Sequence, residues 1–160
     1  MNRRRLALLA GLLVVLGVAL VAALSTAPAL FITGYETTTV EAVDGDTGAS
    51  LASVDARIAD DTLKRYVGLS ATDELDDDEG MLFVHDEPGE YGYVMRNMAF
   101  AIDILFVAPD GEVTRIHEAE PESRPLTTYE GEGQYVLEVP VGWSERHGIE
   151  PGDRIVFDLP

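Results

Sequence analysis

Cysteine is absent from the 160-residue sequence. This absence excludes disulfide bonds, a thiol nucleophile, thiolate zinc sites and iron–sulfur clusters. Basic residues are few, with 11 Lys and Arg against 29 Asp and Glu and a formal net charge of −18. A sequence-independent nucleic-acid binder needs Lys and Arg to displace counterions from phosphate, so we expect no nucleic acid among the partners. The glycines mark turns rather than a phosphate-binding loop, and no cofactor is predicted.

The first 30 residues contain no acidic residue, and an apolar segment fills most of them. Arg3, Arg4 and Arg5 precede an uncharged run of 19 residues from Leu6 to Leu24. A helix of that length is about 28 Å long, close to the bilayer hydrocarbon core of about 30 Å. Since flanking arginines stay cytoplasmic, we expect a single-pass protein of the cell membrane with its N-terminus inside and its C-terminal domain outside. The alternative is a cleaved signal peptide, with Ala27–Ala29 as the cleavage region, and a secreted domain.

The part after residue 30 is strongly acidic. It carries all 29 acids and eight of the 11 basic residues, so its net charge is −21, and Lys64 is its only lysine. A surface of one sign repels itself at low salt. Because the acids are spread along the whole chain, we interpret them as an adaptation to concentrated salt. A surface for cations or for a basic partner is the alternative.

Short strands separated by turn residues are predicted for the exported part. Helical segments are expected from Asp61 or Thr62 to Gly68, around Glu74 and Leu75 after a Thr72 cap, and over 142–147. The predicted strands lie at 37–40, 51–59, 81–85, 92–95, 102–107, 112–117, 134–139 and 155–159. This pattern favours a mainly β fold, a small β-sandwich or barrel-like domain of about eight short strands with two or three short helices, preceded by one transmembrane helix. We divide the chain into the arginines and apolar segment (1–30), a linker and first strand (31–50), and the β domain (51–160).

Several motifs occur in one order along the exported part. They are Thr62–Leu69, Gly80–Val84, Met95–Asn97, Ile102–Ile104, Val136–Val139, Gly142-Trp143, His147–Ile149 and Gly152-Asp153. In this order the sequence resembles the bacterial and archaeal family called domain of unknown function 192, over roughly Val54 to Phe157. The resemblance implies a compact β-rich domain that is frequently exported. It implies no established reaction, because none is assigned to the family.

The central motif of that family departs from its usual form here. The family pattern is Trp-Met-Lys-Asn-Thr, two further residues, and Pro-Leu-Asp. Met95, Asn97 and Asp103 match this pattern. The positions of Trp, Lys, Thr and Pro are occupied by Val94, Arg96, Met98 and Ala101. If the motif lines a site, its polar details differ here, because an aromatic ring and a hydroxyl are missing.

Asp103 is the most informative polar residue of the sequence. It lies in the run Ile102–Val107, where both alternating faces are apolar, so we expect it to be buried. A buried carboxylate needs a cation or several hydrogen-bond donors. Arg96 and Asn97 are the nearest candidates in sequence, and a turn could bring them to Asp103. The alternative is a structural carboxylate that accepts hydrogen bonds from turn amides.

We predict that the contact region of the domain comprises Met81, Met95, Arg96, Asn97 and Asp103. The first hypothesis is a non-catalytic binding or accessory module for an unknown small ligand or an exported protein, held at the membrane through residues 6–24. The second is a small enzyme that uses Asp103 as acid or base, with Arg96 and Asn97 holding the substrate.

The third hypothesis is a metal carrier. Met81, Met95 and Met98 could offer thioethers to copper(I), but methionine is also an ordinary core residue. Three histidines, His85, His117 and His147, are spaced about thirty residues apart, without the spacing of a metal motif. We therefore predict no metal ligand and assign no catalytic residue.

Overall fold

The computed structural model describes residues 34–160. The segment Leu6–Leu24, predicted to span the membrane, lies outside the described residues. Within the described part, none of the helices is both long enough and apolar enough to cross a bilayer.

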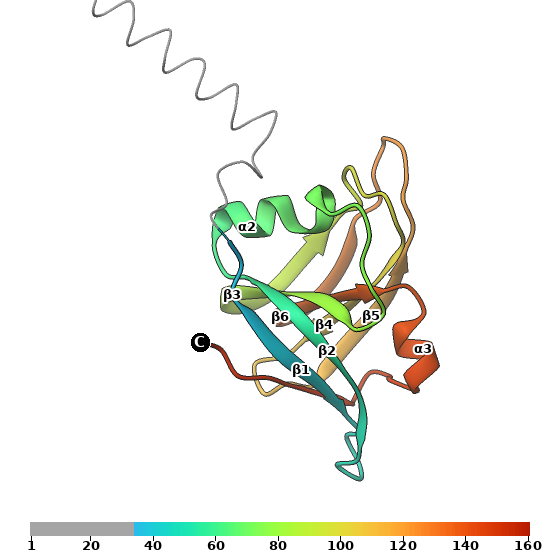
Figure 1. Ribbon diagram of the computed structural model, residues 1–160. Coiled ribbons are helices and arrows are strands. Elements are labelled where there is room, and N and C mark those ends of the chain that lie inside the picture. Colours follow the sequence, from blue (N-terminus) through green and yellow to red (C-terminus); the bar gives the residue numbers. More distant parts are fainter. Residues whose placement is uncertain (1–33) are drawn as a thin grey trace, which may run out of the picture. The chain divides into compact units, whose positions relative to one another are not determined.

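One curled sheet of seven strands forms the described part, in the order β5-β4-β6-β3-β2-β1-β7 (Figure 1). The strands are β1 Thr37–Val43, β2 Ser50–Ala59, β3 Glu79–Tyr93, β4 Ile102–Val107, β5 Val113–Ala119, β6 Tyr129–Pro140 and β7 Arg154–Val156. Only the β2–β3 pair of this sheet is parallel. The mainly β prediction is confirmed. The strand number is lower than predicted, because the segments 81–85 and 92–95 belong to the single long strand β3.

The two edge strands of the sheet meet at one end. The Val113 amide donates to the carbonyl of Asp153 at 2.8 Å, and the Ile155 amide donates to the carbonyl of Gly111 at 2.8 Å. These bonds join the start of β5 to β7, so the sheet curls into a half-barrel with an enclosed inner face. The turn at Pro109–Gly111, predicted from its residues, connects β4 to β5.

Apolar side chains cover both faces of the central strands. Because successive side chains of a strand point to opposite faces, neighbouring residues of β3, β4 and β6 belong to different clusters. The inner cluster includes Val40, Val54, Leu82, Leu105, Val113, Leu137, Val139, Trp143 and Ile155. The outer cluster includes Leu69, Met81, Phe83, Met95, Ile102, Ile104, Phe106 and Val136. The outer cluster needs a cover of its own, since it lies outside the curl.

The connection between β2 and β3 supplies part of that cover. It contains α2 (Thr62–Val67) followed by the 3-10 turn η2 (Gly68–Ala71). Asp61 caps α2, because its Oδ1 accepts hydrogen bonds from the amides of Leu63 and Lys64, both at 2.8 Å. Figure 1 shows α2 crossing one end of the sheet beside β3. Parallel strands need such a crossover, and here it places η2 against the outer cluster.

The helix expected around Glu74 and Leu75 does not form. The Thr72 amide instead closes η2 by donating to the Leu69 carbonyl at 2.9 Å. Six of the seven residues from Asp73 to Glu79 are acidic. Like charges three and four residues apart destabilise a helix, which explains why this stretch stays irregular. The last helix, α3 (Trp143–His147), is confirmed and ends at Gly148 in the left-handed region with φ 67°.

Candidate functional site

A cavity of about 350 Å³ lies on the outer face of the half-barrel. Its walls come from α2, η2, β3, the segment after β3, and the end of β6. The apolar lining residues include Val67, Leu69, Phe83, Met95, Met98 and Ile102. The main polar lining residues are Arg65, His85, Tyr93, Arg96 and Glu138. This combination of apolar walls and a few polar groups is typical of small-molecule sites.

Glu138 is the deepest acidic group of the site. On β6 it pairs with Met81 of β3 and Ile104 of β4, so its side chain lies among outer-cluster residues. The residue is 6% exposed. No hydrogen bond or ion pair of its carboxyl group is found among residues 34–160. Burial raises the pKa of Glu138 to about 8, so the group is mainly protonated at neutral pH.

His85 and Tyr93 form a second polar pair in the cavity. The His85 Nε2 atom lies 2.9 Å from the Tyr93 hydroxyl, at hydrogen-bonding distance. Burial lowers the pKa of His85 to about 4, so the imidazole is neutral at pH 7. Burial is also the main cause that raises the pKa of Tyr93, followed by the nearby Glu138. The floor of the cavity is therefore polar but carries little charge at neutral pH.

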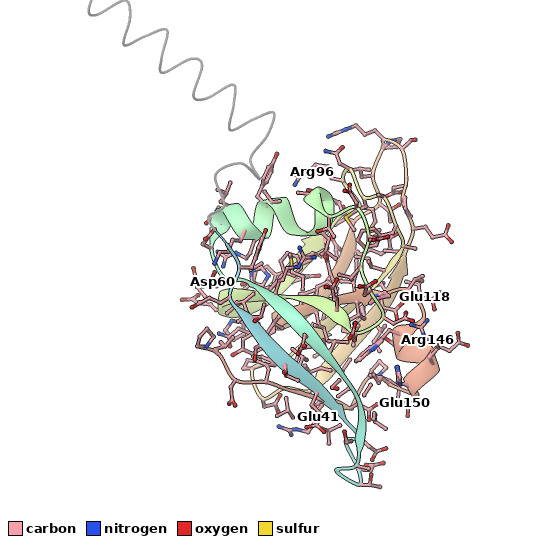
Figure 2. All side chains as sticks on the ribbon, in the orientation of Figure 1. Glu41, Asp60, Arg96, Glu118, Arg146 and Glu150 are labelled. Atoms are coloured by element: carbon pink, nitrogen blue, oxygen red, sulfur yellow. The ribbon has the colours of Figure 1, made fainter. Side chains whose placement is uncertain are left out.

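The charged groups of the cavity are the guanidinium groups of Arg65 and Arg96. Arg65 Nη1 donates to the carbonyls of Asp60 at 2.9 Å and Val84 at 2.6 Å. Arg96 donates to the carbonyl of Tyr66, and its guanidinium carbon lies 3.9 Å from the centroid of the Tyr66 ring. Figure 2 shows Arg96 beside α2. Backbone carbonyls thus hold both cations in place, and Arg65 Nη1 also lies 4.0 Å from Oδ1 of the exposed Asp86.

A second tyrosine contacts basic side chains near α2. The ring of Tyr35, which precedes β1, has Arg57 and Lys64 at 5.8 Å and 5.9 Å from its centroid. Four basic residues are thereby collected around α2 and the rings of Tyr66 and Tyr35, namely Arg57, Lys64, Arg65 and Arg96. Asp60 pairs with one of them, since its carboxylate is 2.8 Å from Lys64 Nζ.

The five residues predicted as a contact region do not form one site. Met95 and Arg96 line the cavity. Met81 is fully buried in the outer cluster, and it lies beside Glu138 in the strand register. Asn97 is exposed and has a φ of 56°, a left-handed conformation that asparagine tolerates better than most residues. Its backbone geometry turns the chain after Arg96.

Asp103 lies on the inner face, away from the cavity lining. Its Oδ1 accepts a hydrogen bond from the Gly142 amide at 2.9 Å, and its Oδ2 accepts one from the Ser144 amide at 2.8 Å. The carboxylate therefore holds the start of α3. The interpretation as a carboxylate bound by turn amides is confirmed. The expected pairing with Arg96 is wrong, because the Arg96 side chain is bound to Tyr66.

The methionines and histidines are also distributed over several places. His85 and Met98 line the cavity, whereas His117 lies on β5 and His147 on α3. His117 is 5.9 Å from Phe106 by ring centroids, and His147 is 5.4 Å from Trp143. In the region from 34 to 160, no group of three or more His, Cys, Asp or Glu side chains is arranged to hold a metal ion.

Glu138 and Tyr93 were not predicted as site residues, and His85 was considered only as one of three separated histidines. For Glu138 the signal was present, since it lies in the run Tyr135–Val139, where its immediate neighbours are Leu137 and Val139. The reasoning that marked Asp103 as a buried acid applies equally to this position. No local pattern marks His85 and Tyr93, because their pairing depends on the bend of β3.

The fold defines a mainly β half-barrel domain, with a cavity on its outer face. The chain belongs to the family described as uncharacterised ACR, domain of unknown function 192, whose family model matches residues 43–157.

Two solved structures are similar to this chain. A Sinorhizobium meliloti protein described as a candidate transcription regulator is 30% identical, with a TM-score of 0.71 over 79% of this chain and 97% of that one. A protein of unknown function from Novosphingobium aromaticivorans is 29% identical, with a TM-score of 0.69 over 79% of this chain and 89% of that one. A comparison with curated proteins gives no match.

Proposed function

We propose that this protein is a non-catalytic binding module that holds a small molecule in the cavity of the outer face. The observation that carries the proposal is Glu138, a carboxyl group at the cavity wall that has no hydrogen-bond partner among residues 34–160 and whose oxygens retain access to the cavity. A ligand that bonds this carboxyl group gains a hydrogen bond, which contributes about 0.5–1.5 kcal/mol. The cavity volume of about 350 Å³ lies within the range of ligand sites, about 300–1,000 Å³.

The contacts around the cavity support binding more than chemistry. The Ser70 hydroxyl donates to the carbonyl of Val67 at 2.5 Å, and Arg65 and Arg96 donate to backbone carbonyls. Such contacts keep the lining groups in fixed positions, which favours selective binding. The enzyme hypothesis built on Asp103 loses its basis, because both carboxylate oxygens accept amide hydrogen bonds.

The sequence supports a position for this module at the outer surface of the cell membrane. Leu6–Leu24 has the length and composition of a spanning helix, and Arg3–Arg5 keep the N-terminus inside. A tag placed after residue 160 should then be digested by protease added to intact cells, and N-terminal sequencing of the membrane-bound protein should begin near Met1. A mature soluble protein that begins after Ala29 would show a cleaved signal peptide instead.

Retention of a ligand by the purified full-length protein tests the binding function. We expect native mass spectrometry, with the protein released from a non-ionic detergent, to show a bound mass of small-molecule size. Glu138→Met should lower the occupied fraction by about ten-fold, since it keeps the side-chain length and removes the hydrogen-bonding group of the cavity. Glu118→Met is the matched control, because Glu118 is an exposed strand residue outside the cavity. Equal occupancy in both variants would contradict the proposal.

A further inference from the structure

Building on the proposed binding function, we infer that the cavity takes a small organic anion with an apolar body. The guanidinium groups of Arg65 and Arg96 bind its acidic group, and the apolar walls contact its body. The carboxyl group of Glu138 faces the far end of the ligand as a hydrogen-bond donor.

The distribution of charge around the cavity is the first support. All 29 acidic residues of the chain lie within residues 34–160, but only Glu138 lines the cavity. Of the eight basic residues in the same part, Arg65 and Arg96 line it. The rest of this domain repels anions, so a site for an anion needs such a local excess of basic groups. A cation is already attracted by an acidic domain, and arginine side chains in the lining would repel it.

The arginine geometry is the second support. A guanidinium group has five N–H donors, and the carbonyl contacts of Arg65 and Arg96, with Asp86 at 4.0 Å from Arg65 Nη1, use only some of them. The face of Arg96 lies on the Tyr66 ring, which leaves the edge of the guanidinium group for a planar acid. Arginine in this arrangement suits a carboxylate or a phosphoryl group, which it can bind through two parallel hydrogen bonds.

The interior of the cavity is the third support. Glu138 is surrounded by apolar groups and is mainly protonated at neutral pH, and His85 is mainly neutral. A protonated carboxyl group donates a hydrogen bond and does not repel an anion. Phe83, Met95 and Ile102 contribute apolar surface to the same cavity, and the charge of Arg65 acts on both His85 and Tyr93. We therefore expect the ligand to have an acidic group for the arginines, an apolar body, and a hydrogen-bond acceptor for Glu138.

Three compounds of nearly equal shape test the charge of the ligand. They are 3-phenylpropanoate, 3-phenylpropanamide and 3-phenylpropylammonium, titrated into the full-length protein by calorimetry at constant salt. We expect the carboxylate to bind about ten-fold more tightly than the amide, and the ammonium compound to bind most weakly. Equal or tighter binding of the amide or the ammonium compound would overturn the anion inference while leaving the binding function intact. If none binds at about millimolar concentration, both proposals fail.

Arg96→Gln tests the acid-binding group. This variant should bind 3-phenylpropanoate about ten-fold more weakly than the parent protein does, and it should bind 3-phenylpropanamide with nearly the same affinity. The unchanged affinity for the amide would show that the cavity is intact. Arg124→Gln is the matched control for net charge, because Arg124 is exposed and lies outside the cavity lining. An equal loss of carboxylate binding in both variants would overturn the assignment of Arg96.

The pH dependence of carboxylate binding gives an independent check of the charge of the ligand. Glu138 ionises around pH 8, so carboxylate affinity should fall as the pH rises from 7 to 9. Glu138→Gln should remove this fall, since glutamine stays neutral. A carboxylate affinity that stays constant or rises over the same interval in the parent protein would overturn the placement of Glu138 at the ligand.

Discussion

Two buried acids, Asp103 on β4 and Glu138 on β6, occupy opposite faces of the same central strands. Asp103 is 1% exposed and Glu138 is 6% exposed, and both have apolar residues on either side in sequence. Asp103 is bound by two amides of the α3 segment at 2.8 and 2.9 Å. Glu138 has no such donor among residues 34–160. Burial alone therefore does not show whether an acid is held by the fold, but the hydrogen-bond donors around it do.

The difference follows from what covers each face. On the inner face the chain returns directly after β6 into α3, whose first amides have no partner within the helix and are free to bond the Asp103 carboxylate. On the outer face the cover is η2 and the segment after β3, which contribute mainly apolar side chains near Glu138. The outer cover leaves a cavity, and the carboxyl group of Glu138 lines it.

Among the substitutions that test this comparison, Glu138→Gln is expected to change the free energy of unfolding most. The pKa of Glu138 is raised from 4.5 to about 8 in the folded protein, so the unfolded chain loses this proton first as the pH rises. The stability contributed by the protonated group is thus present below pH 4.5 and is lost between about pH 4.5 and 8. The variant should be more stable than the parent by about 3–5 kcal/mol at pH 8 and nearly equal at pH 4.

Denaturant unfolding of the two proteins at matched high salt, from pH 4 to 9, measures this difference. Other acids titrate identically in both proteins and cancel in the comparison. A stability difference that stays constant with pH would mean that Glu138 is ionised in the folded state. The contrast with Asp103 would then be lost.

The next largest effect is expected from Asp103→Asn. The asparagine oxygen can accept one of the two amide hydrogen bonds, but its NH₂ group then faces the other amide, so a donor meets a donor. We expect a loss of about 3 kcal/mol in the free energy of unfolding, because bonds to a charged acceptor are strong and the remaining amide is buried. Asp158→Asn, at an exposed position, controls for the charge. Melting at the parent temperature would show that α3 is held by other contacts.

The smallest effect is expected from Ser144→Ala in α3. The Ser144 amide binds Asp103, but its hydroxyl oxygen is buried without a hydrogen-bond partner among the described residues. Alanine keeps the amide and removes the orphaned hydroxyl, so stability should stay the same or rise by less than about 1 kcal/mol. Thermal unfolding of the variant checks this. A clear loss of stability would show that the hydroxyl contributes to the binding of Asp103.

The strand pattern and most turns could be predicted from the sequence, because they depend on neighbours in the chain. The alternation in β2, the cap at Asp61 and the turn at Pro109–Gly111 are examples. The amide contacts of Asp103 could be named only as an alternative, since its donors lie about forty residues later. The cavity could not be predicted, because it depends on how the crossover between β2 and β3 fits over the outer face.

The basic residues collected around α2 partly offset the negative charge at that end of the domain, where Asp60, Asp61 and Asp86 lie beside them. Arg57, Lys64, Arg65 and Arg96 are half of the eight basic residues within 34–160, while most acids lie elsewhere. We therefore expect a negatively charged surface to repel the α2 end of the domain less than the rest, which favours an approach with this end first. The Debye length falls from about 10 Å at 0.1 M to about 3 Å at 1 M salt, so this preference in orientation is strong in dilute medium and is lost in brine.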